Sequence, residues 1–423
     1  MSASELLTLA FAAFLVAGLV VRIWLTSRQI RHVAAHRESV PAAFAGRVSL
    51  EAHRRAAGYT IAKARVGLIE SAFAAAVLLG WTLLGGLDAL NHAVQSWLVP
   101  GMVQQLALLA AFAAISGLLD LPFALYNTFV IEERFGFNKI TWKLWFMDLA
   151  RGVALGAAFG LPIAALILWL MGAAGVWWWL WAWGVWMGFN LLLLVIYPMF
   201  IAPLFNKFQP LQDETLKRRV TELMRRCGFA AKGLFVMDGS RRSAHANAYF
   251  TGFGAAKRVV FYDTLLAKLS PDEVDAVLAH ELGHFKYKHI TKRIALMLTL
   301  SFVGFALLGW LASRAWFYTG LGVRPSLAGA PNDALALLLF LLVVPVFAFF
   351  VSPLAAQLSR RHEFQADAFA AEQTSGHDLA TALLKLYEDN ASTLTPDPVF
   401  VKFYYSHPPA SERLARLGAG AAA

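Results

Sequence analysis

The sequence is poor in cysteine and in charged residues. Cys227 is the only cysteine among 423 residues, so an internal disulfide is impossible and a cysteine-rich zinc site is excluded. Charged residues make up 15% of the chain, against about 25% in an average soluble domain, whereas hydrophobic residues make up 58%. This composition indicates several membrane-spanning segments. The net charge of +10 does not indicate nucleic-acid binding, because the basic residues adjoin apolar segments, where they are interpreted as signals of membrane orientation.

Seven apolar segments are long enough to cross a bilayer, for which about 20 residues are needed. They lie near residues 5–26, 67–88, 102–127, 151–174, 177–204, 291–313 and 334–356. No Lys or Arg precedes Arg22, so the first segment lacks the basic region that begins a signal peptide. The predicted fold is an α-helical polytopic membrane protein.

Lysine and arginine are absent from two predicted loops, GGLDALNHAVQSWLVPG and MGAAG, whereas the loop 27–66 carries eight of them. Basic loops face the cytoplasm in most membrane proteins. The N-terminus and the loop 314–333 are therefore predicted to lie outside, although that loop holds Arg314 and Arg324 as minor exceptions. The chain then divides into four predicted parts: a five-span bundle (1–204), a cytoplasmic insert (205–290), two further spans (291–356) and a cytoplasmic tail (357–423).

The insert is predicted to be a small α/β unit. LKRRVTELMRRCG has helical periodicity and ends at Gly228, which is a good residue for a helix C-terminus. GLFVMD, HANAYF and KRVVFYD are predicted strands, and TGFGAA is a hairpin-like link between the last two. Ser270-Pro271-Asp272-Glu273 matches a capping box, so a helix is predicted to begin there and to run towards or into the sixth span.

That helix would carry the stretch HELGH, residues 280–284. His280 and His284 lie about one helical turn apart, so both imidazoles can reach one metal ion, and Glu281 can reach a water molecule beside it. The longer pattern H-E-x-x-H-x-x-G-x-x-H is excluded because Tyr287 and Ile290 occupy the positions of its glycine and its third histidine. The third ligand must come from elsewhere in the chain.

Acidic residues are scarce after Glu281. The next glutamate is Glu363, and the one acid between them is Asp333, which the predicted topology places on the other side of the membrane. Glu363 and Asp367 are four residues apart and share one face of a predicted helix. Glu363 is therefore the predicted third ligand, and Asp367 is predicted to accept a hydrogen bond from the outer N–H of a ligand histidine.

Other histidines are weaker candidates. His289 and His362 lie close to the predicted ligands in sequence, but they are interpreted as polar or structural residues. His245 has no partner at a ligand spacing and is interpreted as a surface or interface residue.

Three other functions can be weighed against a membrane-face protease. A site-2-type intramembrane protease keeps its H-E-x-x-H within an apolar span, but here the polar stretch PDEVDAVLA precedes it. A transporter places ionisable groups in mid-span, whereas these spans are nearly free of charge. A non-catalytic metal-binding scaffold would need the ligands but not Glu281, whose presence favours an enzyme without excluding the scaffold.

Taken together, the motifs resemble those of the type I CAAX prenyl endopeptidases, which are integral-membrane zinc metalloproteases. The segments that carry the resemblance are IEERFGFNKIT (131–141), YPMFIAPLFNKFQPL (197–211), NAYFTGFG (247–254), HELGH (280–284), SRRHEFQADAFA (359–370) and SHPPASERL (406–414). The shorter heat-shock membrane proteases share the metal motif but lack the long N-terminal bundle and FGFNK, so they are the alternative relatives, with membrane-protein quality control as the alternative function.

The resemblance implies a gluzincin-like zinc protease insert with one Zn²⁺ per chain. His280, His284 and Glu363 would bind the zinc, and Glu281 would activate water, in agreement with the spacing of these residues.

The resemblance also implies residues that hold the substrate. NAYFTGFG resembles an edge strand that pairs with an extended peptide, so Asn247 and Ala248 would bind the peptide backbone. His407 resembles a histidine that stabilises the oxyanion, and Arg413 would support it nearby.

The implied substrate is a polypeptide, prenylated or otherwise membrane-associated, that a monomeric enzyme cleaves near its C-terminus at the cytoplasmic side of the bilayer. The tail GAGAAA has no endoplasmic-reticulum retention signal, which favours a bacterial inner membrane over the endoplasmic reticulum. Bacteria are not expected to make prenylated CAAX proteins, so the physiological substrate stays open.

Overall fold

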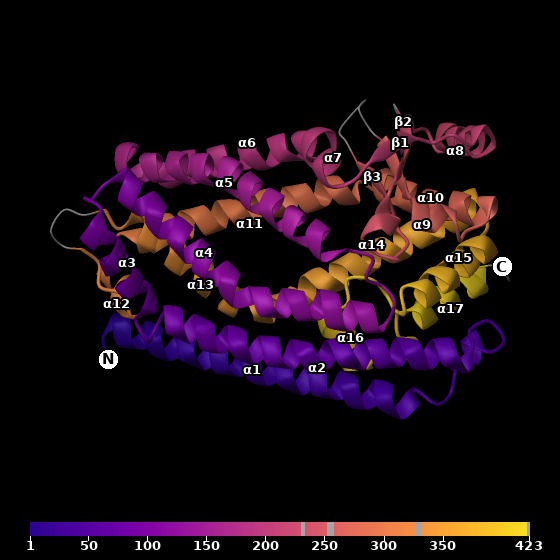
Figure 1. Cartoon of the computed structure of the whole chain (residues 1–423), viewed down its shortest axis with the longest axis horizontal. Helices are drawn as coiled ribbons and strands as arrows, with labels where there is room; N and C mark the ends of the chain where they lie inside the picture. Colours follow the sequence, from indigo (N-terminus) through magenta and orange to yellow (C-terminus); the bar gives the residue numbers. More distant parts are fainter. Residues whose placement is uncertain (230–232, 252–257, 327–330, 421–423) are drawn as a thin grey trace.

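The computed structural model describes residues 1–229, 233–251, 258–326 and 331–420 of the chain (Figure 1). Within these ranges, seven helical segments are long and apolar enough to cross a membrane, which confirms the predicted number of spans. They are Ala3–His36, Leu50–Trp81, Met102–Glu132, Trp142–Ala173, Gly175–Phe205, His289–Ala312 and Asp333–Gln373. The link predicted at TGFGAA falls, after Thr251, outside the described residues.

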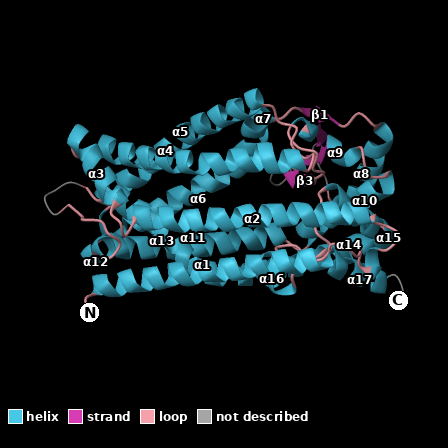
Figure 2. Cartoon of the chain, turned by 60° about the horizontal axis from the view of Figure 1, so that its bottom comes forward, coloured by secondary structure: helices cyan, strands magenta, loops and turns pink. Residues whose placement is uncertain are grey.

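The spans are built from long helices that lie side by side along the molecule (Figure 1). The individual helices are α1 (Ala3–His36), α2 (Leu50–Trp81), α4 (Met102–Tyr126), α5 (Trp142–Ala173), α6 (Trp178–Ile196), α11 (His289–Ala312), α13 (Asp333–Ala348) and α14 (Ser352–Gln373). Figure 2 shows that the strands are confined to one end of this otherwise helical body.

The basic segment 27–66, predicted to be a loop, is mostly helical. Helix α1 continues to His36 and α2 begins at Leu50, so both helices extend well beyond the about 20 residues that a bilayer requires. Hydropathy detects only the apolar part of a helix, and it therefore misses polar turns that continue outside the membrane. The second span was also placed too far along the chain, since α2 ends at Trp81 and the left-handed Gly85 separates it from α3 (Gly86–Trp97).

The end of the molecule that carries the N-terminus is closed by α3 and by α12 (Ala315–Thr319) (Figure 1). Arg324, an exception to the predicted charge asymmetry, donates to the buried carboxylate of Asp88 at 2.9 Å. Its charge is thus neutralised by a partner in α3, between the second and third spans.

The opposite end carries a four-stranded sheet with the strand order β1-β2-β4-β3. The strands are β1 (Phe208–Pro210), β2 (Gly233–Met237), β3 (Ala248–Thr251) and β4 (Arg258–Tyr262). The predicted strands are confirmed. Among the described strands, β3 pairs only with β4, antiparallel, which places it at an edge of the described sheet. Sequence analysis missed β1, because a three-residue strand that ends at Pro210 has almost no periodicity.

Helices pack around this sheet and form its core with it. They are α8 (Glu214–Arg226), α9 (Asp263–Leu266), α10 (Pro271–Lys286), α15 (Gly376–Asp389) and α17 (Ala410–Gly420), together with α14. Helix α16 (Pro398–Tyr404) packs against α14 and α1 instead. Helix α10 points towards the sixth span, as predicted, but Lys288 adopts a left-handed conformation and separates it from α11.

Candidate metal centre and active site

Helix α10 begins where the sequence predicts. The Ser270 side chain accepts the Glu273 backbone N–H, and the Glu273 carboxylate accepts the Ser270 N–H at 2.7 Å, so the capping box is complete. The Glu273 carboxylate also accepts a hydrogen bond from Nζ of Lys385, on α15, at 2.7 Å. Because the start of the helix is fixed in this way, the direction in which His280 and His284 project about three turns later is fixed as well.

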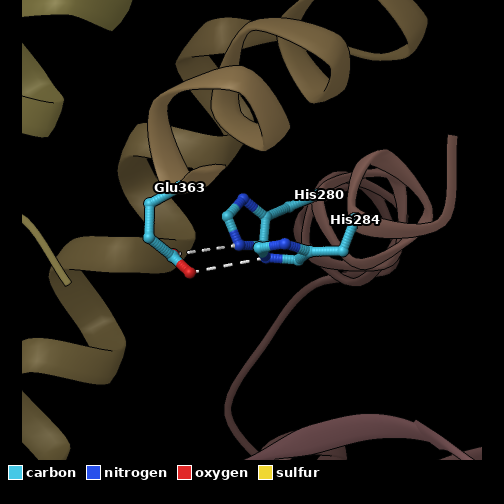
Figure 3. A group of neighbouring side chains, drawn as sticks. All are labelled: His280, His284 and Glu363. Atoms are coloured by element: carbon cyan, nitrogen blue, oxygen red, sulfur yellow. Dashed lines mark ion pairs between the residues drawn. The ribbon is translucent and has the colours of Figure 1, made fainter. Parts of the chain in front are cut away.

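His280 and His284 of α10 meet Glu363 of α14 (Figure 3). The Nε2 atom of each histidine lies 3.5 Å from a carboxylate oxygen of Glu363, His280 from Oε2 and His284 from Oε1. One ligand atom from each of the three residues lies within 4.8 Å of the other two. Among the described residues, these three form the one cluster of this kind, and it contains the ligands predicted from the sequence.

The two helices can approach closely because of Gly283 in the middle of HELGH. A Cβ atom at this position would lie 2.9 Å from Cα of Ala366 on α14, which is closer than real side chains approach. The glycine and the facing alanine therefore allow the backbones to come near enough for Glu363 to reach both histidines.

His280 is held by a series of charged, hydrogen-bonded side chains behind it. Its Nδ1 donates to Asp367 Oδ1 at 2.9 Å, and Asp367 Oδ2 accepts from Nε of Arg413 at 2.8 Å. All three residues are buried. Because Nδ1 carries the hydrogen, Nε2 presents its lone pair towards Glu363, as a metal ligand requires. Arg413, which the resemblance places beside the oxyanion, thus contacts the carboxylate that orients the candidate ligand His280.

His284 is held by a series of neutral, hydrogen-bonded side chains. The amide oxygen of Gln365 accepts from Nε2 of His289 at 2.9 Å, so His289 Nδ1 is free to accept from His284 Nδ1 at 3.0 Å. The Nε2 lone pair of His284 then also faces Glu363. His362 stacks on His289 with ring centroids 4.0 Å apart, and neither histidine is one of the three clustered residues.

The donor set fits a divalent metal such as zinc, which binds imidazole nitrogens and carboxylate oxygens. Glu363 Oε2 is buried, and no described residue gives it a hydrogen bond. Burial lowers the pKa of His284 to about 4, as does the neighbouring His280, so its imidazole is neutral and available as a ligand. Burial also lowers the pKa of His280, but Asp367 and Glu363 outweigh it and raise this pKa to about 9, which indicates that the position favours a cation.

Glu281 is the acid that remains beside the cluster. It lines a cavity of about 170 Å³ together with the three candidate ligands, but it is not one of the clustered groups. Burial raises the pKa of its carboxyl, and the negative charge of Glu363 acts in the same direction. A carboxylate in such surroundings is a stronger base than one in water.

The predicted substrate residues lie in the same cavity. Asn247 and Ala248 line it at the start of β3, whose outer edge is unpaired within the described sheet. Ala248 pairs with Phe261 of β4, and the Asn247 carbonyl accepts the Tyr262 N–H at 3.0 Å, so the strand is fixed on its inner side.

His407 lines the cavity from a turn between α16 and α17. Its Nε2 lies 3.5 Å from Glu363 Oε1, and its side chain is 65% exposed. The turn is fixed by Arg360 of α14, which donates to the Tyr405 carbonyl at 2.6 Å, and by the Tyr387 hydroxyl, which donates to the Pro408 carbonyl at 3.1 Å. Sequence analysis did not find Arg360 or Tyr387, since neither has a recognisable spacing to His407.

The segment FGFNK, to which sequence analysis gave no role, contacts the chain just before β3. Ala244 donates to the Phe137 carbonyl and Lys139 donates to the Arg242 carbonyl, each at 3.1 Å. The Phe137 ring stacks on His245 with centroids 4.3 Å apart. The membrane bundle thereby supports the strand that lines the cavity.

Two further groups hold His245 in place. Its Nδ1 lies 3.1 Å from the Asn390 amide oxygen, which also accepts the Ala246 N–H, and its Nε2 lies 3.6 Å from Glu132. His245 thus joins the third span, β3 and α15, in agreement with its interpretation as an interface residue.

Comparisons with known proteins agree with this geometry. Residues 29–207 match the family model described as CAAX prenyl protease N-terminal, five membrane helices, and residues 210–420 match peptidase family M48. The CAAX prenyl protease 1 homolog of Oryza sativa subsp. japonica is 35% identical, with 96% of each chain covered. CAAX prenyl protease 1 of Saccharomyces cerevisiae is 33% identical and covers 97% of this chain and 94% of its own.

The similarity extends to three dimensions. The crystal structure of S. mikatae Ste24p superposes on this chain with a TM-score of 0.91 and 32% sequence identity, and covers 97% of this chain and 99% of the other. The resemblance found in the sequence is therefore confirmed. The chain belongs to peptidase family M48, alongside the CAAX prenyl protease 1 homologues, and it is a multi-pass membrane metalloendopeptidase.

Proposed function

We propose that the metal is zinc, one ion per chain, and that His280, His284 and Glu363 bind it. The observation that carries the proposal is the convergence of three ligand atoms within 4.8 Å of one another, with the buried Glu363 Oε2 lacking a hydrogen bond from the described residues. Bound zinc supplies a Lewis acid that makes water more acidic and polarises a carbonyl group.

Glu281 acts as the general base in this proposal. Its partly buried carboxylate lines the cavity beside the proposed ligands, so it can take a proton from the attacking water and pass it to the leaving amine. Water adds to the carbonyl carbon, the peptide C–N bond breaks, and the proton from water neutralises the departing nitrogen.

Substrate binding is assigned to β3 and His407. The free edge of β3 at Asn247 and Ala248 offers main-chain groups to an extended peptide, as in other cases of strand addition. The exposed His407 can donate a hydrogen bond to the developing oxyanion, a contribution of about 2.7–4 kcal/mol in comparable sites. The curated relatives are named CAAX prenyl proteases, so we assign this chain a polypeptide substrate that carries a prenylated CAAX-type C-terminus.

The active site is proposed to face the cytoplasm. The metal cluster and the basic segment 27–66 lie at one end of the molecule, opposite the end with the N-terminus, α3 and α12 (Figure 1). Basic segments favour the cytoplasmic side. A reporter fused after Ala423 should therefore report the cytoplasm, and one inserted in the loop 314–333 should report the outside. The reverse result would overturn this orientation.

The central test is Glu281→Gln, which keeps the size of the side chain and removes the base. The variant should retain zinc and bind a farnesylated CAAX peptide, while its single-turnover rate falls at least about 10²-fold. Metal content, peptide affinity and rate should be measured on the same preparation. Cleavage at the wild-type rate would reject the role of Glu281, and loss of zinc would reject the proposed ligand set.

A further inference from the structure

A second and larger cavity adjoins the one that holds the metal cluster. Its volume is about 800 Å³, and it shares four lining residues with the metal cavity: Leu383, Leu386, His407 and Arg413. Its other walls come from α1, α2, the segment 390–393 and the aromatic residues of α16 and the turn that follows it. A peptide that is cut at the metal cluster can therefore extend directly into this space.

The charge of the cavity is one-sided. Among the described residues that line it, Lys63 and Arg413 are cationic and none is an aspartate or a glutamate. Arg413 is already neutralised by Asp367, with which it forms a buried ion pair. Lys63 is also paired, with Glu132, but its side chain is far more exposed than that of Arg413, so it is the cation that a ligand in the cavity can reach.

Lys63 has capacity for another hydrogen bond. Its Nζ lies 3.1 Å from Glu132 Oε1 and 3.2 Å from the Tyr59 hydroxyl, and an ammonium group has three donors. Its side chain is 49% exposed. Glu132 is absent from the lining of this cavity, although it lines the neighbouring cavity together with Lys63.

Gln29 supplies a second, independent sign that this cavity accepts an oxygen-rich ligand. The residue is only 1% exposed, and its Oε1 accepts the Asp397 N–H at 2.7 Å. Its Nε2 makes no hydrogen bond of good geometry to any described residue, although the Tyr405 hydroxyl lies near it. A buried amide donor whose neighbouring acceptor is poorly aligned costs free energy that a better placed ligand oxygen would recover.

We propose that this cavity receives the C-terminal segment that leaves after cleavage. Lys63 binds the terminal carboxylate of that segment, and Gln29 donates to one of its oxygens. Leu383, Leu386 and Tyr404 offer apolar surface to its side chains. The inference rests on the proposed function, because cleavage near a C-terminus brings the substrate's own terminal carboxylate close to the metal cluster.

The test compares two peptides that differ only at the terminus. One is a farnesylated CAAX peptide with a free C-terminal carboxylate, and the other is its C-terminal amide. The wild-type enzyme should favour the free acid by about tenfold or more in kcat/KM, mainly through KM, since a charge-assisted hydrogen bond is lost in the amide. Lys63→Gln should abolish this preference by weakening the free acid and leaving the amide unchanged.

Three further variants separate carboxylate binding from a structural role. Lys63→Arg should retain most of the preference. Glu132→Gln removes the carboxylate beside Lys63 and leaves the positive charge of Lys63 in place, so the preference for the free acid should persist or increase. Lys217→Gln, which removes an exposed lysine paired with Glu214 on α8, is the matched control and should behave as the wild type.

The outcomes are distinguishable. If the wild type cleaves acid and amide equally well, the carboxylate site is rejected while the proposed protease function stands. If Glu132→Gln loses the preference just as Lys63→Gln does, the pair is structural and the proposal is also rejected. If neither peptide is cleaved although zinc is bound, the proposed function itself fails.

Discussion

The two histidines of HELGH occupy neighbouring turns of one helix, yet the residues behind them differ in charge. Behind His280 stand Asp367 and Arg413, a buried ion pair whose carboxylate accepts the Nδ1 hydrogen. Behind His284 stand His289 and Gln365, which are neutral. Both arrangements give the same tautomer and turn the same Nε2 atom towards Glu363.

The difference shows that orientation and electrostatics are separate tasks in this site. Neutral hydrogen-bond partners are enough to fix the tautomer of a histidine, whereas a carboxylate behind the ring also makes the ring nitrogen that faces the metal more basic. Arg413 then offsets the negative charge that Asp367 would otherwise add to the buried cluster. The His280 side is therefore expected to be the more sensitive to mutation.

The largest effect is expected for Glu363→Ala, which removes the group that both histidines face. The variant should lose most of its zinc, because two imidazoles alone leave a structural or catalytic zinc site incomplete. His362→Ala, next to it on α14, is the control and should keep the metal. Full zinc occupancy in Glu363→Ala, measured by elemental analysis, would show that the third ligand lies elsewhere.

The next effect is expected for His407→Phe, whose Nε2 faces the same Glu363 oxygen as His284. Its hydrogen bond is proposed to form mainly in the transition state, so turnover should fall about 10²–10³-fold while zinc content and peptide affinity stay close to wild type. Single-turnover kinetics and a binding titration separate these quantities. A loss that appears only in affinity would assign His407 to ground-state binding.

Asp367→Asn tests the charged side of the comparison. Zinc affinity should fall about 10–100-fold, the usual cost of removing a partner of a ligand histidine. The change also leaves the Arg413 guanidinium buried without a counter-ion, which costs about 3–5 kcal/mol in comparable pairs. Adding Arg413→Leu to this variant should therefore restore thermal stability but not zinc affinity. If both recover together, Asp367 supports the fold rather than the ligand.

The parts of this site that could be predicted from sequence are those that depend on local spacing. The capping box at Ser270, the one-turn spacing of His280 and His284, and the one-turn spacing of Glu363 and Asp367 each lie within a single helix. The choice of Glu363 needed only the scarcity of acids and the number of spans. The seven spans themselves follow from apolar composition over about 20 residues.

The remaining contacts join segments that are far apart in sequence and have no periodic signal. Asp367 and Arg413 are 46 residues apart, and Lys63 and Glu132 are 69 apart. Whether such residues meet depends on how whole helices pack, which one sequence does not encode as a pattern. The polar extensions of α1 and α2 were missed for a similar reason, since hydropathy stops where the membrane ends.

The smallest effect is expected for His289→Ala, on the neutral side of the comparison. The substitution removes the acceptor for His284 Nδ1, but water can take its place, because the side chain of His284 is 20% exposed whereas that of His280 is 10% exposed. Zinc should stay at about one ion per chain, with affinity reduced less than about tenfold, the scale of one neutral hydrogen bond. Competition with a chelator measures the zinc affinity of His289→Ala and of Asp367→Asn under the same conditions. If His289→Ala loses as much affinity as Asp367→Asn, then the charge behind His280 contributes nothing beyond orientation, and the two sides of the site are equivalent.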